Sequence, residues 1–347
     1  MARVQTRELV RIGRTVGAVG LGCWQLGGGW GEMSEAQAMG VLHAAVDAGV
    51  DFFDTADVYG DGRSERLVGR LLAERTDKVL TVATKCGRRV AQDPANYTAA
   101  ALRSWAERSR ENLGVDKIDL TQLHCPPYEV YDGDWVFDAL DGLVAEGVLG
   151  AYGVSVETVA EGLRAIEHPG VASVQVIFNA FRLKPMEALI PACAERGIAV
   201  LARVPLASGL LSGKYREDTA FGPDDHRNYN RDGSHFDVGE TFSGVPFEVG
   251  LRAARRLAKE AIPLWADGGS GSMGPAGESW ELTLPELALR WVLDTPGVTV
   301  VIPGARTPEQ ARANARVGDL MSLPATSREA VGKIYDEELR PLVHDRW

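Results

Sequence analysis

Four side chains that can move or steer a proton lie at or near the ends of three predicted strands. Asp54 ends a short apolar run, and Tyr59 follows it on the next loop. Lys85 and His124 end two further apolar runs. A free tyrosine has a pKa near ~10, and a nearby ammonium group lowers that value because it favours the phenolate. We therefore expect Tyr59 to donate a proton to a carbonyl oxygen, with Lys85 lowering its pKa.

Each of these residues also has an ordinary structural explanation. Lys85 and Asp54 suit a buried ion pair. His124 suits a hydrogen-bonded position in the core, and Tyr59 suits a surface loop. Their common place at strand ends favours one shared site, in which Asp54 fixes the Lys85 ammonium and His124 binds the substrate oxygen. The sequence shows no serine nucleophile elbow and no pair of strand-end carboxylates that would indicate hydrolysis.

The elements that position these residues repeat along the chain as helix, glycine and short apolar strand. Glycine after a helix suits the left-handed conformation that turns the chain back toward a sheet. The strands lack strict polar–apolar alternation, as expected where both faces are buried. Strands that alternate with helices predict a (β/α)8 barrel rather than a doubly wound sheet, and no G-x-G-x-x-G opens a helix after the first strand. The expected strands are residues 16–24, 51–54, 79–85, 118–124, 149–155, 173–178, 198–203 and 298–302.

We expect a single barrel domain, residues 1–347, with additions at both ends and one irregular region. Polar–apolar alternation over residues 3–16 predicts an N-terminal β-hairpin, and extra C-terminal helices follow the eighth strand. Between the seventh and eighth strands, residues 208–248 form a long polar loop with several aromatic residues, which favours an ordered flap or a partner contact over disorder. Residues 265–280 are rich in glycine and predict a flexible insertion.

The overall charge and the cysteines exclude several classes of protein. The 347 residues carry a formal net charge of −11, which argues against general binding to nucleic acid or to an anionic membrane. The four cysteines lack metal-binding spacing, so we expect reduced thiols and no metal site. No apolar run approaches the roughly 18 residues of a membrane span, and the N-terminus lacks an apolar signal core. These features predict a cytoplasmic protein.

Short motifs surround the candidate residues and follow one another along the chain. They are GLGCW at 20–24, residues 51–60 with SE at 64–65, TKCG at 84–87, LH at 123–124, GVS at 153–155, PLASGLLSGK at 205–214 and IPGARTPEQ at 302–310. Together they are similar to the aldo-keto reductase family over nearly the whole chain. The catalytic residues of that family match Asp54, Tyr59, Lys85 and His124. The resemblance implies a barrel enzyme that reduces an aldehyde or a ketone with a nicotinamide cofactor.

The resemblance also implies that the cofactor lies extended across the mouth of the barrel. Ser155 and Gln175 would bind the carboxamide. From the nicotinamide to the adenosine end, the other residues expected along the cofactor are Gly22, Cys23, Trp24, Asp54, Arg203, Leu206, Ser208, Gly209, Lys214, Gly304, Arg306, Gln310 and Asn314. Arg306 beside a helix N-terminus suits a 2′-phosphate, so NADPH is expected over NADH, unless Arg306 stacks on adenine instead.

Two positions depart from the pattern of the family. Val156 stands where many relatives have an asparagine that contacts the carboxamide. Arg203 stands where many have an aromatic residue that stacks on the nicotinamide. A guanidinium can stack on the ring too, or it can form a buried ion pair beneath the cofactor.

Substrate choice belongs to the loops, where the sequence says least. The expected pocket contains Trp24, Trp30, Tyr59, His124 and Tyr128, and it leaves aldehydes, ketones and sugar-derived carbonyls open as the small-molecule partner. Two alternatives belong to other classes: a cofactor-binding regulatory or scaffold subunit with little turnover, and an isomerase or lyase with a Schiff-base lysine. A regulatory subunit would not need the complete set of Asp54, Tyr59, Lys85 and His124. A Schiff-base enzyme would need a further lysine at a strand end, besides Lys85. The residues predict no oligomeric state.

Overall fold

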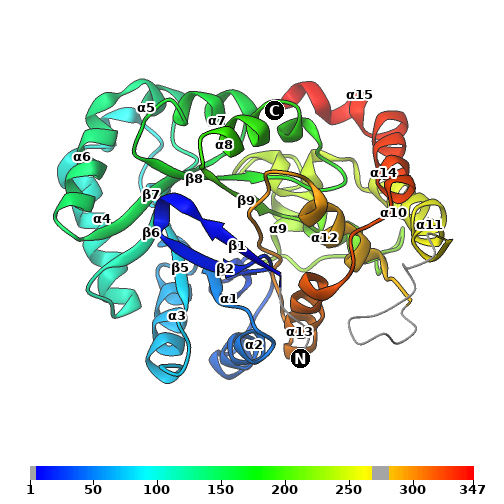
Figure 1. Cartoon of the computed structure of the whole chain (residues 1–347), viewed down its shortest axis with the longest axis horizontal. Helices are drawn as coiled ribbons and strands as arrows, with labels where there is room; N and C mark the ends of the chain where they lie inside the picture. The colour runs from blue at the N-terminus through cyan, green and yellow to red at the C-terminus, as the bar shows by residue number, and fades with distance from the viewer. Residues whose placement is uncertain (1–4, 268–280) are drawn as a thin grey trace.

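Eight parallel strands curl into a barrel, and helices pack around its outside (Figure 1). The structure is a computed structural model that describes residues 5–267 and 281–347. The strands follow one another in chain order, and parallel bridges from Val19 to Val301 and from Gly22 to Gly304 join the last strand to the first. This arrangement confirms the predicted (β/α)8 barrel. The strands are β3 Leu21–Gly22, β4 Phe52–Asp54, β5 Thr81–Cys86, β6 Ile118–His124, β7 Leu149–Val156, β8 Val171–Ile177, β9 Ala199–Arg203 and β10 Val300–Val301.

The register of the strands brings polar residues to one end of the barrel. Asp54 on β4 pairs with Gly22 on β3, and His124 on β6 pairs with Ser155 on β7. Ser155 pairs in turn with Gln175 on β8. Because all eight strands run in the same direction, these residues meet at the C-terminal end of the barrel, where barrel enzymes carry their active sites.

The outer helices begin where capping chemistry predicts. Ser34 accepts a hydrogen bond from Gln37 N, and the Gln37 side chain accepts one from Ser34 N, which completes a capping box. Thr158 and Thr283 start their helices in the same way. The helices between strands are α2 Glu35–Asp47, α3 Arg63–Glu74, α4 Ala99–Leu113, α6 Asp134–Ala145, α7 Val159–Ala165, α8 Leu189–Glu195 and α12 Leu284–Asp294. The short helices α1 Trp24–Gly27 and α5 Tyr128–Asp132 follow β3 and β6, and α13 Pro308–Arg316, α14 Ala325–Glu338 and α15 Arg340–Val343 complete the C-terminal part.

A β-hairpin closes the N-terminal end of the barrel. Its strands, β1 Thr6–Leu9 and β2 Arg14–Gly17, pair antiparallel, as predicted. The expected strand over residues 16–24 is wrong in its extent, because Val16 belongs to the hairpin and the regular strand β3 spans only Leu21–Gly22, preceded by the single bridge from Val19 to Val301. The buried side chains of Leu9 and Val16 form one apolar cluster with inward-facing barrel residues. These are Phe52, Ala83, Leu120, Ala151, Ala172, Ala199, Leu201, Val300 and Ile302.

The chain between β9 and α12 contains 3-10 turns and helices of different lengths. Within the expected loop over 208–248 lie α9 His226–Tyr229 and the 3-10 turns Val238–Glu240 and Phe242–Gly244. The 3-10 turn Ala207–Ser212 precedes them, and α10 Phe247–Glu260 and α11 Ile262–Asp267 follow. The insertion predicted over 265–280 overlaps the end of α11, and its residues 268–280 lie outside the described part of the chain.

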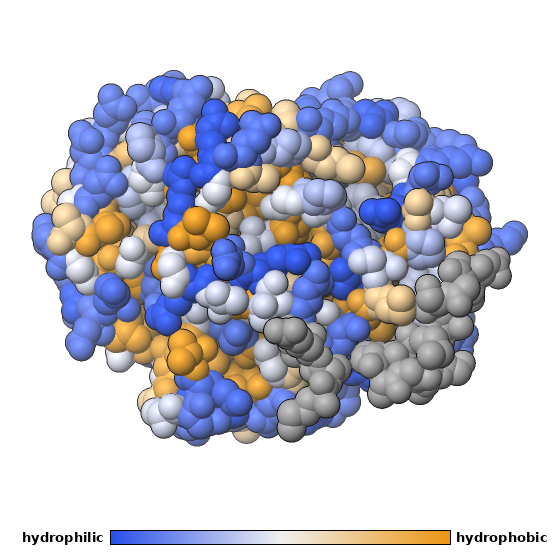
Figure 2. Space-filling model, in the orientation of Figure 1, coloured by the Kyte–Doolittle hydropathy of each residue, from blue (hydrophilic) through white to orange (hydrophobic). Residues whose placement is uncertain are grey.

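The face that carries the hairpin mixes hydrophilic and apolar residues (Figure 2). Hydrophilic residues run across its centre, and smaller apolar areas lie between them. Among the residues described, no helix has both the length and the apolar character needed to cross a bilayer.

Candidate active site

A buried ammonium group joins an acid and a phenol at the C-terminal ends of β4 and β5. Lys85 Nζ lies 2.5 Å from Asp54 Oδ1 and 3.4 Å from the Tyr59 hydroxyl. It also donates a hydrogen bond of 2.9 Å to the carbonyl oxygen of Thr55. Lys85 is fully buried, and a buried charge is tolerated when it is paired and hydrogen-bonded. The structure thus brings three of the four predicted residues into direct contact.

Two glutamines, one on β6 and one on β8, hold the other oxygen of the carboxylate. Gln175 Nε2 lies 2.7 Å from Asp54 Oδ2, and Gln122 Nε2 lies 3.3 Å from the same atom. The Gln175 amide nitrogen, expected at the nicotinamide carboxamide, therefore donates to the acid in this structure. Gln122 is a residue that sequence reasoning missed. Its position could have identified it from the sequence: Gln122 lies two residues before His124 on β6, and residues two apart on a strand face the same side.

The Tyr59 hydroxyl is protonated at neutral pH. Burial raises the pKa of Tyr59 to about 12, although the Lys85 ammonium acts to lower it. The expected net lowering is therefore wrong, because the loss of water around a phenolate outweighs one nearby charge. For Lys85, burial acts to lower the pKa, but Asp54 and Tyr59 reverse that effect and raise it. The pair is a neutral phenol beside a charged ammonium.

His124 borders the same site as a neutral ring. It meets the Tyr59 ring edge-on with 5.9 Å between centroids, and only 5% of the residue is exposed. Burial, and then the charges of Arg88, Lys85 and Arg203, hold the pKa of His124 well below its usual range. The His124 Nδ1 atom is buried and has no hydrogen-bond partner among the described residues. A neutral imidazole with an unpaired ring nitrogen can bind a polar group of a ligand.

Aromatic rings form a wall beside the phenol. Trp24 stacks on Tyr59 with 6.0 Å between centroids, and it meets Trp30 edge-on at 5.5 Å. His226 of α9 packs against these two indoles at 4.8 and 4.3 Å. With His124, four of the five residues expected in the substrate pocket lie in one chain of ring contacts. The fifth, Tyr128, is 47% exposed, and its ring packs on another tyrosine of α5.

Arg203 lies within a buried group of charges. Its Nη2 atom lies 3.0 Å from Glu157 Oε2 and donates a 3.0 Å hydrogen bond to the Val156 carbonyl. Its Nη1 atom pairs with the carboxylate of Glu240. This geometry is the buried ion pair, one of the two roles that the sequence leaves open for Arg203. Glu157 and Glu240 are partners that sequence reasoning missed.

The same group of charges extends to two more arginines. Arg88 Nη2 lies 3.0 Å from Glu157 Oε1, and Arg182 donates a hydrogen bond to the Glu157 carbonyl. Burial opposes ionisation of the Glu157 carboxyl, but the guanidinium groups, led by Arg203, outweigh burial and lower its pKa to about 2. Glu157 is thus an anion held among three cations.

The expected pyrophosphate segment is tied to these charges. Ser208 and Gly209 both have positive φ angles, 53° and 96°, within a 3-10 turn. The Ser208 hydroxyl donates a 2.8 Å hydrogen bond to the carbonyl oxygen of Glu240. Leu206 and Gly209 are half-buried, whereas Lys214 is exposed. Glu240 therefore joins Arg203 through its side chain and the pyrophosphate segment through its backbone.

The expected adenosine end lies around the loop after β10. Arg306 is exposed, and its Nη2 atom donates a 3.1 Å hydrogen bond to the Glu32 carbonyl. Its Nη1 atom donates a hydrogen bond to the carbonyl of Trp30, which lies in the same loop as Glu32. Gln310 Oε1 accepts a 2.8 Å hydrogen bond from Arg306 N, and Asn314 Nδ2 donates one of 3.2 Å to Gly304 O. The structure thus places the residues expected at the adenosine end together beside the start of α13.

Unpaired buried polar atoms at the barrel mouth suit the polar groups of a bound cofactor. Gly22 and Gly304 are bridged side by side, and a Cβ atom on Gly22 would lie 2.9 Å from the Ile302 carbonyl, so the close approach of the first and last strands requires glycine there. Gln25 Oε1 and Trp30 Nε1 are buried polar atoms that have no hydrogen-bond partner among the residues described. Buried polar atoms are costly unless a ligand or water pairs them.

The remaining expected residues lie at the same end. Cys23 N donates a 2.8 Å hydrogen bond to the Asp54 carbonyl, and the thiol is buried. The buried Ser155 hydroxyl lies 3.6 Å from the sulfur of Cys125. In the described ranges no group of three or more His, Cys, Asp or Glu side chains could hold a metal ion.

Known proteins resemble this chain in sequence and in structure. The Aldo/keto reductase family matches residues 18–336. Aldo-keto reductase YhdN of Bacillus subtilis (strain 168) is 29% identical over 305 residues, which cover 86% of this chain and 84% of that protein. The NADH-specific methylglyoxal reductase of Escherichia coli (strain K12) is 27% identical over 86% of this chain and 89% of its own. The structure of a glycerol dehydrogenase from Gluconobacter oxydans is similar with a TM-score of 0.76 and 30% identity, covering 98% of this chain and 97% of the other.

The family match spans most of the chain and includes every strand of the barrel. The geometry at the C-terminal end agrees with it, because the acid, lysine and tyrosine are in contact there. This chain therefore belongs to the aldo/keto reductase family and is an oxidoreductase that uses a nicotinamide cofactor to reduce a carbonyl group.

Proposed function

We propose that this protein reduces a small aldehyde or ketone to an alcohol, with NADPH as cofactor and Tyr59 as the proton donor. One observation carries the proposal. The Tyr59 hydroxyl lies 3.4 Å from Lys85 Nζ, which is fixed by Asp54 at 2.5 Å. A phenol beside a fixed ammonium is suited to proton donation, because the ammonium stabilises the phenolate that remains.

Each residue of the set has a separate task in this proposal. The bound cofactor supplies hydride to the carbonyl carbon. Tyr59 gives its hydroxyl proton to the carbonyl oxygen, and with a pKa of about 12 the phenol carries that proton at neutral pH. Lys85 stabilises the phenolate, and Asp54 keeps Lys85 in place. Neutral His124 donates a ring N–H to the same oxygen and orients it.

The choice of NADPH depends on the adenosine end. Arg306 lies beside the N-terminus of α13, and the planar guanidinium suits a 2′-phosphate. To bind it, Arg306 would exchange its present hydrogen bonds to two loop carbonyls for the phosphate oxygens. The NADH-specific relative shows that not every similar protein prefers NADPH. Stacking of Arg306 on adenine is the alternative, and it would not distinguish the two cofactors.

We propose a small oxygenated carbonyl compound as the substrate. Two relatives are named for glycerol and for methylglyoxal, which are small and rich in oxygen. Sugar-derived carbonyls remain within this class. A regulatory or scaffold subunit with little turnover has no specific observation in its favour.

Replacing Tyr59 by phenylalanine tests the proposal. We expect the Tyr59→Phe variant to lose about 10²- to 10⁴-fold in kcat, because the proton donor is removed and the ring is kept. Absorbance at the nicotinamide band, followed against a panel of aldehydes and ketones, measures the loss. Binding of NADPH, measured by fluorescence titration, should persist.

Tyr97→Phe is the matched control. Tyr97 is buried, and its hydroxyl bonds Gln92 at 3.1 Å rather than the buried lysine. This variant should keep its turnover. If Tyr59→Phe retained turnover close to that of Tyr97→Phe, the proposed role of Tyr59 would be wrong.

We also propose that the enzyme works in the cytoplasm. All four cysteines are free and buried, which suits a reducing compartment. The proposal predicts unchanged activity in the presence of a reductant.

A further inference from the structure

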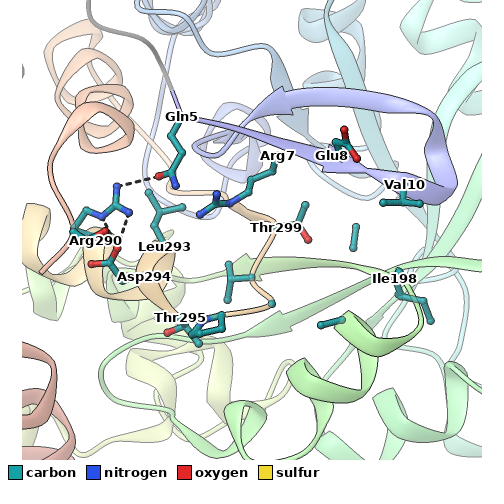
Figure 3. Close-up of a pocket in the computed structure, with 17 residues that line it drawn as sticks. Gln5, Arg7, Glu8, Val10, Ile198, Arg290, Leu293, Asp294, Thr295 and Thr299 are labelled. Carbon is teal, nitrogen blue, oxygen red and sulfur yellow. Dashed lines mark hydrogen bonds and ion pairs between the residues drawn. The ribbon is translucent and has the colours of Figure 1, made fainter. Parts of the chain in front are cut away.

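A cavity lies on the N-terminal face of the barrel, at the opposite end from Lys85. Its volume is about 480 Å³, within the range of small-molecule sites. Its walls come from the hairpin, from the start of β9 and from the chain between α12 and β10 (Figure 3). Apolar and polar residues line it in similar measure. Among them are Arg7, Val10, Ile198, Arg290, Leu293 and Thr299.

Among the described residues, the side chain of one of the three hairpin arginines has no hydrogen-bond or ion-pair partner, and this arginine lines the cavity. Arg11 donates hydrogen bonds to the carbonyls of Pro169, Val171 and Arg196. Arg14 pairs with a carboxylate of β6 at 2.8 Å. Arg7 is half-buried, and its side chain forms no hydrogen bond or ion pair within the described ranges. Figure 3 shows its side chain directed from the hairpin into the cavity.

The neighbouring charges do not neutralise Arg7. Arg290 is only 3% exposed and pairs with Asp294 Oδ1 at 2.6 Å. The other oxygen of Asp294 accepts a 2.7 Å hydrogen bond from Leu323 N, so this acid is already engaged. Glu8 also lines the cavity, but it is exposed, and solvent screens its charge. Burial and the like charge of Arg290 lower the pKa of Arg7, although the charge of Asp294 acts to raise it.

The remaining walls suit a molecule with an apolar part. Ile198, Leu293 and Val298 are buried apolar residues at the cavity wall. Thr299 Oγ1 accepts a 3.0 Å hydrogen bond from Val200 N, which leaves its hydroxyl proton to donate. A half-buried cation, a hydroxyl donor and apolar surface therefore border one space.

We propose that this cavity is a second ligand site, which binds a small organic anion through Arg7. The ligand carries a carboxylate or a phosphate monoester, whose oxygens accept charge-assisted hydrogen bonds from the guanidinium. Its apolar part rests on Ile198 and Leu293. The net charge of −11 opposes non-specific anion binding, so binding at this cavity depends on the local cation Arg7. The proposal does not depend on the reductase reaction.

Calorimetric titration with four probes tests the site. Hexanoate and hexyl phosphate present the two head groups on an apolar chain, whereas acetate and inorganic phosphate lack the chain. We expect saturable binding of at least one chain-bearing probe at millimolar concentration, tighter than that of its chainless counterpart. The Arg7→Gln variant should bind this probe at least about tenfold more weakly, because charge-assisted hydrogen bonds are lost.

Arg14→Gln is the matched control, since it removes one positive charge from the same hairpin outside the cavity. This variant should bind the probe as the unmodified protein does. Val10→Glu gives a second reading, because Val10 lines the cavity and is 65% exposed, so an added carboxylate there should repel the anion without loss of folding. Equal binding by the Arg7→Gln and unmodified proteins would overturn the proposal, as would the absence of saturable binding by all four probes.

Discussion

The two ends of the barrel come from the same strands but from opposite kinds of residue. On β4, Phe52 belongs to the apolar layer under the hairpin, and Asp54, two positions later, belongs to the site. On β5, Ala83 and Lys85 stand in the same relation. Residues two apart on a strand face the same side. On each of these two strands, an apolar inward-facing residue is therefore followed directly by a polar one. Stability and chemistry are thus separated along the barrel axis.

The difference predicts different responses to mutation. At the N-terminal end, removing side-chain atoms leaves a void, and the cost falls on folding. At the C-terminal end, removing one partner leaves a buried charge or a polar atom unpaired, and the cost falls on both folding and ligand binding. Substitutions at each end therefore test whether the separation holds.

Leu9→Ala should show the largest effect on stability. Leu9 is fully buried in the apolar layer of the hairpin and the strand starts. Its loss should lower the free energy of unfolding by about 2–5 kcal/mol, because a cavity is left in a packed core. Chemical denaturation measures the change. Turnover per folded molecule should stay the same, because no atom at the other end moves.

The exposed neighbour Val10 provides the control for this prediction. Val10→Ala removes apolar atoms from the same hairpin, but the residue is 65% exposed, so stability should hardly change. A Leu9→Ala variant that lost turnover per folded molecule would show that the two ends are coupled.

The repeating helices and strands of the barrel can be predicted from the sequence. Helix caps, glycines after helices and apolar runs predict the barrel, and the strand ends predict Asp54, Lys85 and His124 as neighbours. The helix bounds agree within a few residues where a capping side chain marks the start, as at Ser34. Periodic patterns succeed because each repeats a local geometric rule.

The irregular part is not readable in the same way. Glu240 pairs with Arg203 across 37 positions and lies in a segment without periodic pattern, so no local rule connects them. The pKa of Tyr59 also escaped prediction, because its direction depends on how completely the fold removes water. Sequence motifs identify which residues approach one another, whereas burial decides how their charges behave.

Asp57→Asn tests how much a buried, unpaired carboxylate at the C-terminal end of the barrel destabilises the fold. Asp57 is 1% exposed, and neither of its carboxylate oxygens has a hydrogen-bond partner among the described residues. Burial, and then the charge of Glu65, raise the pKa of Asp57 to about 7, although Arg89 and Arg108 oppose the shift. An unfolded aspartate ionises near about 3.9. The folded protein therefore binds more protons between these values.

The sign of the pH dependence follows from that difference. The contribution of Asp57 to the free energy of unfolding falls as the pH rises from about 4 to about 7. Above pH 7 the full cost of its buried charge persists. At pH 8 the neutral amide should raise the free energy of unfolding by roughly 2–4 kcal/mol, and at pH 4 it should give no gain. Asp138→Asn, at an exposed position of α6, controls for the change in net charge. Equal stability of Asp57→Asn and the unmodified protein at pH 8 would contradict an unpaired buried acid.

Glu240→Gln should have the smallest effect and should separate binding from folding at the C-terminal end. The Glu240 side chain pairs with Arg203, and its carbonyl accepts a hydrogen bond from Ser208 in the expected pyrophosphate segment. A neutral amide weakens the pair with Arg203, while Glu157 still holds that guanidinium. We expect NADPH to bind about tenfold more weakly, in line with one charge-assisted hydrogen bond, while kcat at saturating cofactor is retained.

Another buried pair, Arg290 with Asp294, gives the matching control at the other end. Both side chains are 3% exposed, so Asp294→Asn should lower stability without changing the dissociation constant of NADPH. Fluorescence titration and thermal denaturation of the two variants distinguish the cases. If both variants weakened NADPH binding equally, the effect would come from general loosening of the barrel. If only Glu240→Gln did so, the buried charges at the strand ends position the cofactor segment, and the two ends of the barrel differ in function as well as in composition.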